Sequence, residues 1–346
     1  MARCLISFGA NIGQPAETIR QAAEQLEQRL SGRLQDFYLS RLFRTPAVGG
    51  PVGQPPFLNA VAALDVSGTT AWDVWQAVRE IEHALGRVRV ERWEARRIDL
   101  DVLLFEDQRI WTPHFKLPHP RMVMRRFILE PALDVAPNWR DPVSGMTISQ
   151  LAANLRSGPA SILLVGNNLS EAQKLLERAA RTSGSQWLTP EFIGLGREPT
   201  AGGAMCAAPT GRWLGLASSR SLCTGNFLAL RPAPKLIFVL AEPSLTEGAA
   251  WEDVHRAAAA WLGLCDMAAS SPEPALVQVE PTAGSRLALD VGSDRADSLV
   301  KLSGLVGWPL PGPRYLLACD DLRWTEHEII AAMEAMDCPV EPLGGQ

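Results

Sequence analysis

The residues best suited to chemistry lie close together between residues 86 and 105. Two aspartates, Asp99 and Asp101, alternate there with Ile98, Leu100 and Val102, which is the pattern of a β-strand. Residues two apart in a strand share a face, so the two carboxylates project side by side and the three apolar side chains lie on the other face. Two carboxylates at this spacing suit Mg²⁺, which binds one or two carboxylates together with the phosphates of a substrate.

A group of arginines directly precedes this strand. It consists of Arg87, Arg89, Arg92, Arg96 and Arg97, with Trp93 among them. A guanidinium group can donate two parallel hydrogen bonds to phosphate oxygens and so binds phosphate with a defined geometry. Metal-binding carboxylates next to phosphate-binding arginines indicate phosphoryl-type transfer from a nucleotide.

Each half of this pattern also has an ordinary structural explanation. A pair of aspartates on one strand face often belongs to a solvated sheet edge, and runs of arginine often form solvated surfaces or nucleic-acid-binding patches. For each group alone the sequence leaves both explanations open. The adjacency of the two groups, with Trp93 in the middle, favours a shared site for metal and phosphate.

Composition excludes several other classes of protein. The 346 residues suffice for two domains, and 47% hydrophobic with 21% charged residues is typical of a globular chain. No apolar run reaches about 18 residues, so we expect no membrane-spanning helix, and residues 1–13 suit a first strand better than a signal peptide. The six cysteines are scattered without a CxxC pair, which disfavours a zinc site or disulfide framework and predicts a cytoplasmic location.

Charge divides the chain into two parts. The residues before Lys235 include 26 basic and 21 acidic side chains, whereas those from Lys235 onward include 7 basic and 17 acidic ones. An anionic substrate suits the basic part, although a net charge of −5 gives no indication of bulk nucleic-acid binding. Residues 156–160, which contain Gly and Pro, are the predicted linker between a domain of residues 1–155 and one of residues 161–346.

The elements predicted for the first domain follow the order β-α-β-β-α-β. Apolar runs predict strands at residues 4–8, 34–45, 57–66 and 98–104, and helical spacing predicts helices at residues 15–30 and 70–85. Thr70 and Asp73 form a capping-box-like start of the second helix. We expect residues 106–107 to turn a hairpin into residues 109–111, and the Gly- and Pro-rich residues 46–56 to form a functional loop. The order predicts an α+β, ferredoxin-like fold.

The second domain is expected to be a three-layer α/β unit. Strands are predicted at residues 161–165, 235–241 and 314–319, and helices at residues 170–180, 251–264 and 325–336, while residues 182–224 receive no assignment. Residues 166–170 lie at a strand-to-helix junction, where P-loops occur, but lack the second Gly and the Lys of that motif. The unit resembles a deoxynucleoside-kinase-like domain without its P-loop. An unrelated α/β interaction domain, through which a homodimer could form, is the alternative.

Several motifs in the first domain occur together and in a characteristic order. They read FGANIG, SRLFRTPAVG, QPPFLNAV, EIEHALGRVRVERWEARRIDLDVLLF and the stretch from Leu117 to Leu133. Residues 3–155 thereby resemble the 6-hydroxymethyl-7,8-dihydropterin pyrophosphokinases of folate biosynthesis. The resemblance implies transfer of pyrophosphate from ATP to the hydroxymethyl group of the pterin, with release of AMP. It also implies small-molecule substrates only, with no nucleic acid and no membrane as a partner.

The resemblance assigns roles to individual residues. Asp99 and Asp101 match the pair that holds two Mg²⁺ ions between the phosphates of ATP. The matching catalytic positions are Arg87, Arg89, Arg92, Trp93 and Arg96, and those for ATP are Glu82, Arg87, Arg92, Ile98, His119 and Arg125. In the family the tryptophan belongs to a loop that closes over the site and excludes water.

Pterin recognition falls on a third group of matching residues. They are Thr45, Pro46, Ala47, Val48, Phe57, Asn59 and Phe127. A flat heterocycle with polar edges needs aromatic faces, which Phe57 and Phe127 can supply, and an amide such as Asn59 that both donates and accepts. Without the resemblance, both phenylalanines would be interpreted as ordinary core residues.

The sequence departs from the family pattern in three places. Glu94 and Ala95 replace the usual Gly-Pro after the tryptophan, which changes the backbone preferences of the loop and adds a negative charge near the expected triphosphate. His114 stands where some members carry Arg, and Ala10 where Ser is usual. None of these changes removes a metal ligand, so we expect an enzyme. The alternatives are a non-catalytic ATP- or pterin-binding regulator on the same fold and a ferredoxin-like nucleic-acid binder.

Overall fold

The strands of the first unit form one antiparallel sheet. The computed structural model describes residues 1–87, 93–112, 114–166, 169–188, 209–218, 233–241, 313–318 and 322–344. Strand β1 (Ala2–Ala10) is an inner strand of the sheet. It pairs on one side with β4 (Phe57–Val66) and on the other with β5 (Asp99–Phe105). Strands β2 (Leu34–Leu39) and β3 (Phe43–Thr45) both pair with β4. This arrangement confirms the predicted ferredoxin-like fold.

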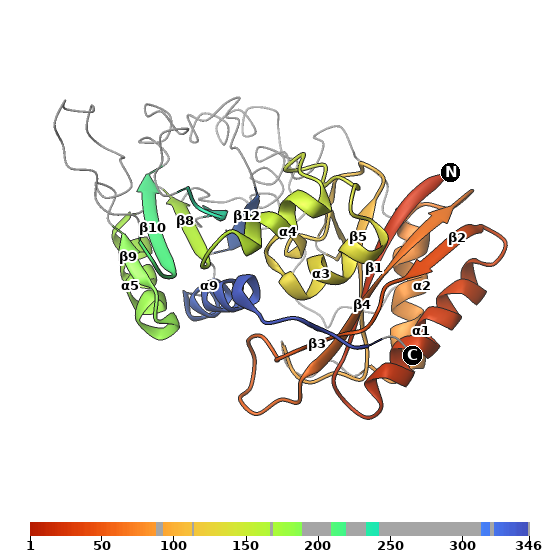
Figure 1. Ribbon diagram of the computed structural model, residues 1–346. Helices are drawn as coiled ribbons and strands as arrows, with labels where there is room; N and C mark the ends of the chain where they lie inside the picture. The colour runs from red at the N-terminus through yellow and green to blue at the C-terminus, as the bar shows by residue number, and fades with distance from the viewer. Residues whose placement is uncertain are drawn as a thin grey trace, which may run out of the picture.

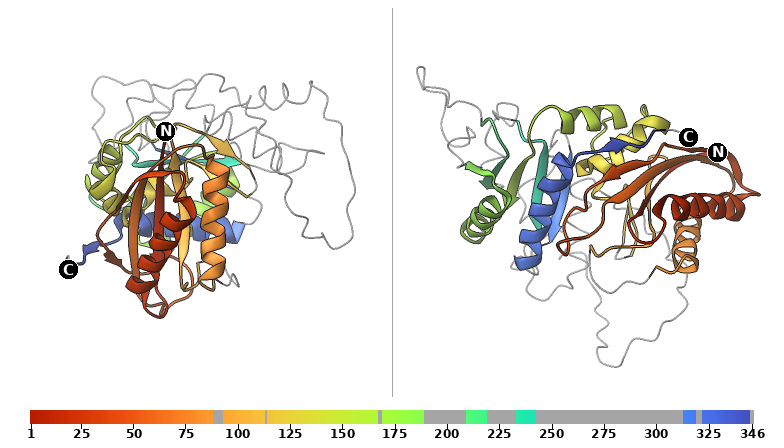
Figure 2. Two further views of the ribbon diagram at one scale, coloured as in Figure 1. Left: turned by 90° about the vertical axis from the view of Figure 1, so that its right-hand side faces the viewer. Right: turned by 60° about the horizontal axis from the view of Figure 1, so that its bottom comes forward.

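Helices α1 (Pro15–Leu30) and α2 (Ala71–Ala84) cover one face of this sheet (Figure 2). Their buried stripes, including Leu26 and Val78, pack with Ile6 and Phe8 of β1 in one apolar cluster. Helix α2 starts as predicted, because the Thr70 hydroxyl accepts a hydrogen bond from the Asp73 N–H and the Asp73 carboxylate accepts one from the Thr70 N–H. Alternation along β1 turns its remaining side chains toward the other face, where the candidate residues lie.

The predicted single strand at residues 34–45 is interrupted. The Ser40 N–H still bonds to the carbonyl of Val61, but the Ser40 hydroxyl, rather than a backbone carbonyl, accepts the hydrogen bond of the Val61 N–H at 3.0 Å. A side chain that replaces a ladder partner ends regular pairing, so β2 and β3 are separate strands. The expectation of one continuous strand was therefore wrong.

The expected hairpin after β5 was also wrong. Strand β6 (Ile110–Trp111) pairs with β7 (Lys116–Leu117) and not with β5. The tight connection explains this pairing, because the Thr112 hydroxyl both donates to the Phe115 carbonyl and accepts from the Phe115 N–H. A 3₁₀ turn η1 (Met122–Met124) and helices α3 (Arg126–Val135) and α4 (Ile148–Arg156) follow.

The second unit contains a parallel sheet with the spatial order β12-β11-β8-β10-β9 (Figure 1). Its strands are β8 (Ser161–Gly166), β9 (Gln186–Leu188), β10 (Trp213–Ser218), β11 (Leu236–Ala241) and β12 (Arg314–Ala318). Helices α5 (Leu169–Ser183) and α9 (Leu322–Asp337) accompany it. Residues 251–264, predicted to be helical, and residues 167–168 of the P-loop-like junction lie outside the described residues. The kinase-like nature of this unit therefore stays a prediction.

The two units share one apolar core. A single buried cluster contains Leu5 and Leu103 of the first sheet, Leu129 of α3, Ile162 of β8 and Ile329 of α9. After α9 the chain returns to the first sheet, where β13 (Glu341–Pro342) pairs with β3 (Figure 1). The domain boundary at residues 156–160 stays a prediction. The apolar core is continuous across this boundary.

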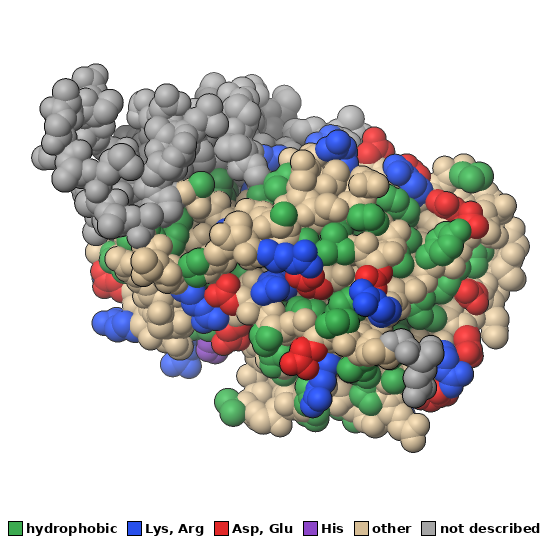
Figure 3. All heavy atoms as spheres, in the orientation of Figure 1, with side chains coloured by type: hydrophobic (Ala, Val, Ile, Leu, Met, Phe, Trp, Pro, Cys, Tyr) green, Lys and Arg blue, Asp and Glu red, His purple; other side chains and the backbone are tan. Residues whose placement is uncertain are grey.

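The predicted linker is itself fixed by the second unit. The Lys235 ammonium donates to the carbonyl of Leu155 at 2.6 Å and also to that of Gly158, and the Ala160 N–H donates to the Asp337 carboxylate at 2.9 Å. Among the described helices, none is both long and apolar enough to cross a membrane. Acidic and basic side chains are mixed on the face of the molecule shown in Figure 3, so that face offers no continuous basic surface.

Candidate functional site

Strands β1 and β5 place the two aspartates on the face of the sheet opposite helices α1 and α2. Asp99 pairs across with Gly9 and Asp101 with Ser7, while Leu100 between them is buried on the helix side. The side chains of Asp99 and Asp101 are 20% and 33% exposed. Their predicted position on a common, accessible face of the strand is confirmed.

Asp99 lies between two arginines. Arg96 donates a hydrogen bond to one carboxylate oxygen, Oδ2, and the Arg87 Nη2 lies 2.5 Å from the other, Oδ1. That second oxygen is buried and forms an ion pair with Arg87. In a site that binds Mg²⁺, the metal ion would compete with the two guanidinium groups for this carboxylate, and the phosphates would compete with the carboxylate for the guanidinium groups.

Glu82 of α2 holds this end of the site in place. Its buried carboxylate accepts hydrogen bonds from the Leu100 N–H at 2.8 Å and from Arg87. The side chain thus connects helix α2, strand β5 and the first arginine of the cluster. In this arrangement Glu82 positions Arg87 and strand β5. Glu82 would therefore affect ATP binding through these two elements.

Asp101 faces His119 and Arg125. The His119 Nε2 lies 3.6 Å and the Arg125 Nη1 lies 4.0 Å from Asp101 Oδ2. Burial lowers the pKa of His119 well below its ordinary value of 6.5, and the charges of Arg125 and Arg121 lower it further. His119 is therefore neutral at pH 7, and because its Nδ1 accepts from the Arg121 N–H at 3.2 Å, its proton lies on Nε2 and faces Asp101.

Arg125 keeps its charge although it is buried. Burial, followed by the nearby charge of Arg121, lowers the pKa of Arg125 to about 10, whereas Asp101 and Asp99 oppose the shift. The group remains protonated at pH 7. Its guanidinium carbon lies 5.4 Å from the centre of the Phe127 ring, so the same residue connects the phosphate side of the site to an aromatic side chain.

A pocket adjoins Asp99. It encloses about 530 Å³ of space, part of it open to solvent. Its walls are Gly9, Thr45, Pro46, Val48, Phe57, Asn59, Trp93, Glu94, Arg96, Asp99, Arg125 and Phe127. The buried Asn59 amide donates to the Thr45 hydroxyl at 2.9 Å, which fixes its orientation. A pocket that combines a fixed amide and two phenylalanines with charged side chains suits a flat heterocycle with polar edges.

Comparison with known proteins identifies the family. Residues 5–137 match the family model described as 7,8-dihydro-6-hydroxymethylpterin-pyrophosphokinase (HPPK). The 2-amino-4-hydroxy-6-hydroxymethyldihydropteridine pyrophosphokinase of Pseudomonas aeruginosa is 38% identical over 151 residues, which are 44% of this chain and 90% of the relative. The chain belongs to the HPPK family. The enzyme of the same name from Synechocystis is 34% identical over 147 residues, 42% of this chain and 73% of that protein.

Residues 138–346 lie beyond the match to the HPPK family model. In the comparison with solved structures, an HPPK-DHPS in complex with substrates gives a TM-score of 0.34 at 11% identity, and the match covers 53% of this chain and 55% of that one. The HPPK family thus accounts for the first unit. The second unit has no counterpart in the family model.

Most of the residues that the HPPK resemblance singled out meet in one place. Six of the seven expected pterin residues line the pocket, and the seventh, Ala47, is not among its walls. Ile98 is fully buried in the core with α1 and α2, so a contact with ATP would come from its backbone. Arg89 and Arg92 lie outside the described residues. His114 is exposed in the turn between β6 and β7.

Two HPPK site residues of the first unit escaped the sequence reasoning. The Asn11 side chain accepts a hydrogen bond from the Arg96 N–H at 2.6 Å and donates to the Pro55 carbonyl at 3.1 Å, so it joins the two loops that border the pocket. Gly9 lies in the pocket wall, where an added Cβ would lie 3.4 Å from Asn59 Oδ1. The link between Asn11 and Arg96 spans 85 positions and has no local signal in the sequence.

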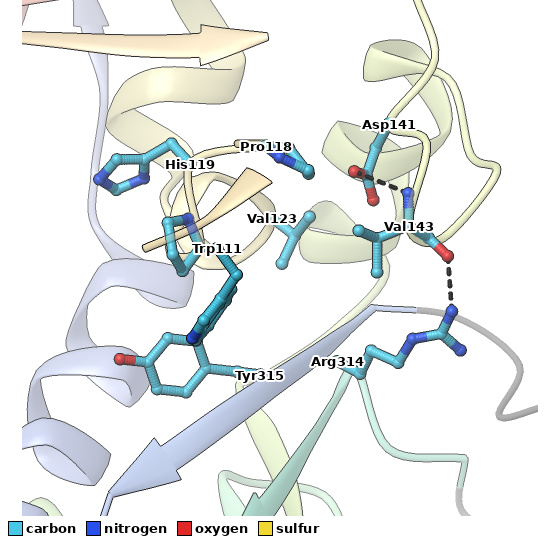
Figure 4. Close-up of a pocket in the computed structure, with 9 residues that line it drawn as sticks. Trp111, Pro118, His119, Val123, Asp141, Val143, Arg314 and Tyr315 are labelled. Carbon is cyan, nitrogen blue, oxygen red and sulfur yellow. Dashed lines mark hydrogen bonds between the residues drawn. The ribbon is translucent and has the colours of Figure 1, made fainter. Parts of the chain in front are cut away.

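The second unit also reaches the HPPK site. His119 lines a further small pocket with Trp111, Val123, Asp141, Val143, Arg314 and Tyr315 (Figure 4). There Arg314 of β12 donates to the Val143 carbonyl at 2.7 Å, and the Val143 N–H donates to the Asp141 carboxylate at 3.3 Å. These contacts fasten β12 to the segment that follows α3. Residues from the acidic half of the chain therefore stand directly behind His119.

Proposed function

We propose that this chain transfers the terminal pyrophosphoryl group of ATP to the hydroxymethyl oxygen of 6-hydroxymethyl-7,8-dihydropterin, giving AMP and the pterin diphosphate in tetrahydrofolate biosynthesis. This is the reaction of a 2-amino-4-hydroxy-6-hydroxymethyldihydropteridine diphosphokinase. The observation that carries the proposal is that Asp99, Arg96 and Arg125 line the same pocket as Phe57 and Asn59. A heterocycle in that pocket would lie directly beside the groups suited to metal and phosphate.

The proposed metal ligands are Asp99 and Asp101. The Asp99 carboxylate, whose buried Oδ1 is paired with Arg87, and the partly exposed Asp101 carboxylate form a hard-oxygen donor set that fits two Mg²⁺ ions completed by the phosphates of ATP. When bound, such ions would neutralise charge on the attacked phosphate and on its leaving group. Among the described residues no third carboxylate, cysteine or histidine completes a metal cluster, so the substrate would provide the remaining ligands.

The protein's own residues bind and orient the phosphates. Arg87 and Arg96 would move from Asp99 to phosphate oxygens when the nucleotide binds, because both reach that carboxylate already. Arg125, charged at pH 7, adds a buried positive charge, and the neutral His119 can donate one hydrogen bond from Nε2. Arg89 and Arg92 are proposed catalytic residues on the strength of the resemblance alone. Catalysis in this scheme rests on position and charge.

Pterin recognition is assigned to the pocket itself. Phe57 and Phe127 offer ring faces, and the Asn59 amide keeps one N–H and its carbonyl oxygen for the ring edge after bonding to Thr45. Trp93 lines the same pocket, in agreement with its proposed role of excluding water. The cytoplasmic location and a homodimer formed through the second unit stay predictions.

One observation favours the second candidate function, a non-catalytic ATP- or pterin-binding regulator. Glu94, which replaces a glycine of the family pattern, lines the pocket beside Arg96 and Asp99. A carboxylate there repels a triphosphate and weakens ATP binding. The regulator would bind pterin and release no AMP.

Release of AMP from ATP by the whole chain distinguishes the two functions. AMP should appear when Mg²⁺ and 6-hydroxymethyl-7,8-dihydropterin are both present, and omission of either should abolish it. A Glu94→Gly variant tests the effect of the departure from the family pattern, and we expect a lower KM for ATP. Pterin binding without AMP formation in either protein would favour the regulator and overturn the enzyme.

A further inference from the structure

Helix α9 of the second unit contacts both chain segments that border the pterin pocket. We name residues 46–56 the glycine loop and residues 93–97 the tryptophan segment. Helix α9 packs against α5 of the second unit and against α3 and η1 of the first unit (Figure 1). The family model does not include this helix.

The first contact joins two tryptophans. The ring centres of Trp93 and Trp324 are 4.6 Å apart with the planes inclined at 35°, a packed aromatic pair. Trp93 has a φ of 61°, a left-handed conformation that residues other than glycine rarely adopt. Such a conformation persists where the surroundings determine it. Trp324 is one of the groups that hold Trp93 at the pocket wall.

The second contact fixes the glycine loop. The Glu334 carboxylate accepts a hydrogen bond from the Gly49 N–H at 3.1 Å. A Cβ added to Gly49 would lie 3.3 Å from the Cβ of Ala331, so the loop lies directly against the helix. Gln54 in the same loop donates to the Trp93 carbonyl at 2.9 Å. The helix, the loop and the tryptophan segment therefore form one connected group.

The wall of the pterin pocket is also the surface that faces α9. Val48, Trp93, Arg125 and Phe127 line the pterin pocket, and the same four residues line a narrower space whose other side is α9. That side consists of Glu328, Ala331, Ala332 and Ala335. Small side chains allow the helix to approach the wall closely. A displacement of α9 would therefore change the shape of the pocket.

We infer that Trp324 and Glu334 of the second unit are positioning residues for the first unit, which hold Trp93 and the glycine loop in the arrangement that binds the pterin. This inference rests on the proposed function, because it assigns the pocket to the pterin. It gives the second unit a role in substrate binding that needs no ligand of its own. The effect acts through Trp93 and Gly49, since neither Trp324 nor Glu334 lines the pterin pocket.

The test compares variants of α9 in the full-length chain. Trp324→Ala removes the ring contact and Trp324→Phe keeps an aromatic partner. Glu334→Ala removes the hydrogen-bond acceptor, whereas Glu334→Gln keeps an acceptor oxygen for the Gly49 N–H. The matched control is Glu326→Ala on the same helix, which breaks a pair with Arg178 inside the second unit at 2.9 Å.

Two quantities are measured for each protein, the Kd for 6-hydroxymethyl-7,8-dihydropterin by calorimetry and the kcat and KM for AMP release. We expect Trp324→Ala and Glu334→Ala each to weaken pterin binding by about two- to tenfold. Trp324→Phe and Glu334→Gln should recover most of the loss, and Glu326→Ala should match the wild type. The Tm of each variant is measured as well. A variant that is only less stable has a lower Tm but keeps the wild-type Kd at temperatures well below that Tm.

The outcomes separate the inference from the proposed function. A wild-type chain that binds pterin but releases no AMP overturns the function, while the Kd values still decide the role of α9. Pterin affinities of both alanine variants equal to that of Glu326→Ala overturn the inference. Should Trp324→Ala not fold, Glu334→Ala against Glu334→Gln decides alone, because that pair changes a partly exposed side chain.

Discussion

Removal of the Glu328 carboxylate should weaken the junction between the two units. Glu328 is buried on α9 and accepts hydrogen bonds from the Arg121 Nε at 2.8 Å, from a second Arg121 nitrogen and from the Tyr315 hydroxyl of β12 at 2.6 Å. The arginine belongs to the first unit, so the carboxylate joins three segments across the shared core. Glu328→Ala would leave a largely enclosed guanidinium and a buried hydroxyl without this acceptor.

The size of the effect follows from burial. Loss of one partner from a buried ion pair costs about 3–5 kcal/mol, and an isolated surface pair contributes roughly 1 kcal/mol or less. The Glu328 side chain is 7% exposed but that of Arg121 is 31% exposed, so water relieves part of the cost. We expect Glu328→Ala to lower the free energy of unfolding by about 2–4 kcal/mol and the Tm by roughly 4–10 °C.

Denaturant unfolding measures this loss, and a double-mutant cycle with Arg121→Ala assigns it to the pair. Glu326→Ala, whose partner Arg178 is 45% exposed, is the control on the same helix and should cost roughly 1 kcal/mol or less. The reasoning fails if Glu328→Ala is no more destabilising than Glu326→Ala. It also fails if the losses of Glu328→Ala and Arg121→Ala simply add.

Two further predictions concern the glycine loop and the acid stability of the fold. Gly50 has a φ of 73°, and an added Cβ would lie 2.2 Å from the Trp93 carbonyl oxygen, whereas one at Gly53, with a φ of 86°, would meet no described atom within 4 Å. Gly50→Ala should therefore raise the Kd for pterin at least about fivefold above that of Gly53→Ala, and equal values in a calorimetric titration would contradict the packing. Arg41 donates two side-chain hydrogen bonds to Asp134, which lowers the pKa of that carboxyl below its ordinary 3.8. Since the unfolded chain binds this proton more readily, the stabilisation is present above about pH 4 and is lost as the pH falls through the folded-state pKa; unfolding curves of Asp134→Asn should lose part of that acid slope, and an unchanged slope would contradict the pairing.

Local patterns were enough to predict how the two candidate metal-binding carboxylates lie on their strand. Alternation placed Asp99 and Asp101 on one accessible face, and the Thr70 capping box located the start of α2. Both depend on residues at most three positions apart, whose geometry the backbone period fixes. A similar signal at Thr147 and Gln150, which form the capping box of α4, was overlooked.

Contacts between distant residues could not be predicted in this way. Arg121 and Glu328 are 207 positions apart, and neither sequence neighbourhood indicates that the other exists. The same holds for Trp93 with Trp324 and for Gly49 with Glu334. The predicted linker at residues 156–160 suggested two independent domains. A segment that contains Gly and Pro does not reveal that the apolar faces before and after it pack into one core.

The most direct test of the account is AMP release by Asp99→Asn and Asp101→Asn over a range of Mg²⁺ concentrations. Each substitution keeps the shape of the side chain but removes the charge that would hold the metal. Turnover should fall by about 100-fold or more, while the Tm stays close to that of Asp107→Asn, a control at an exposed position just after β5. Turnover of either variant near that of the control would contradict the assignment of these two carboxylates as the metal site.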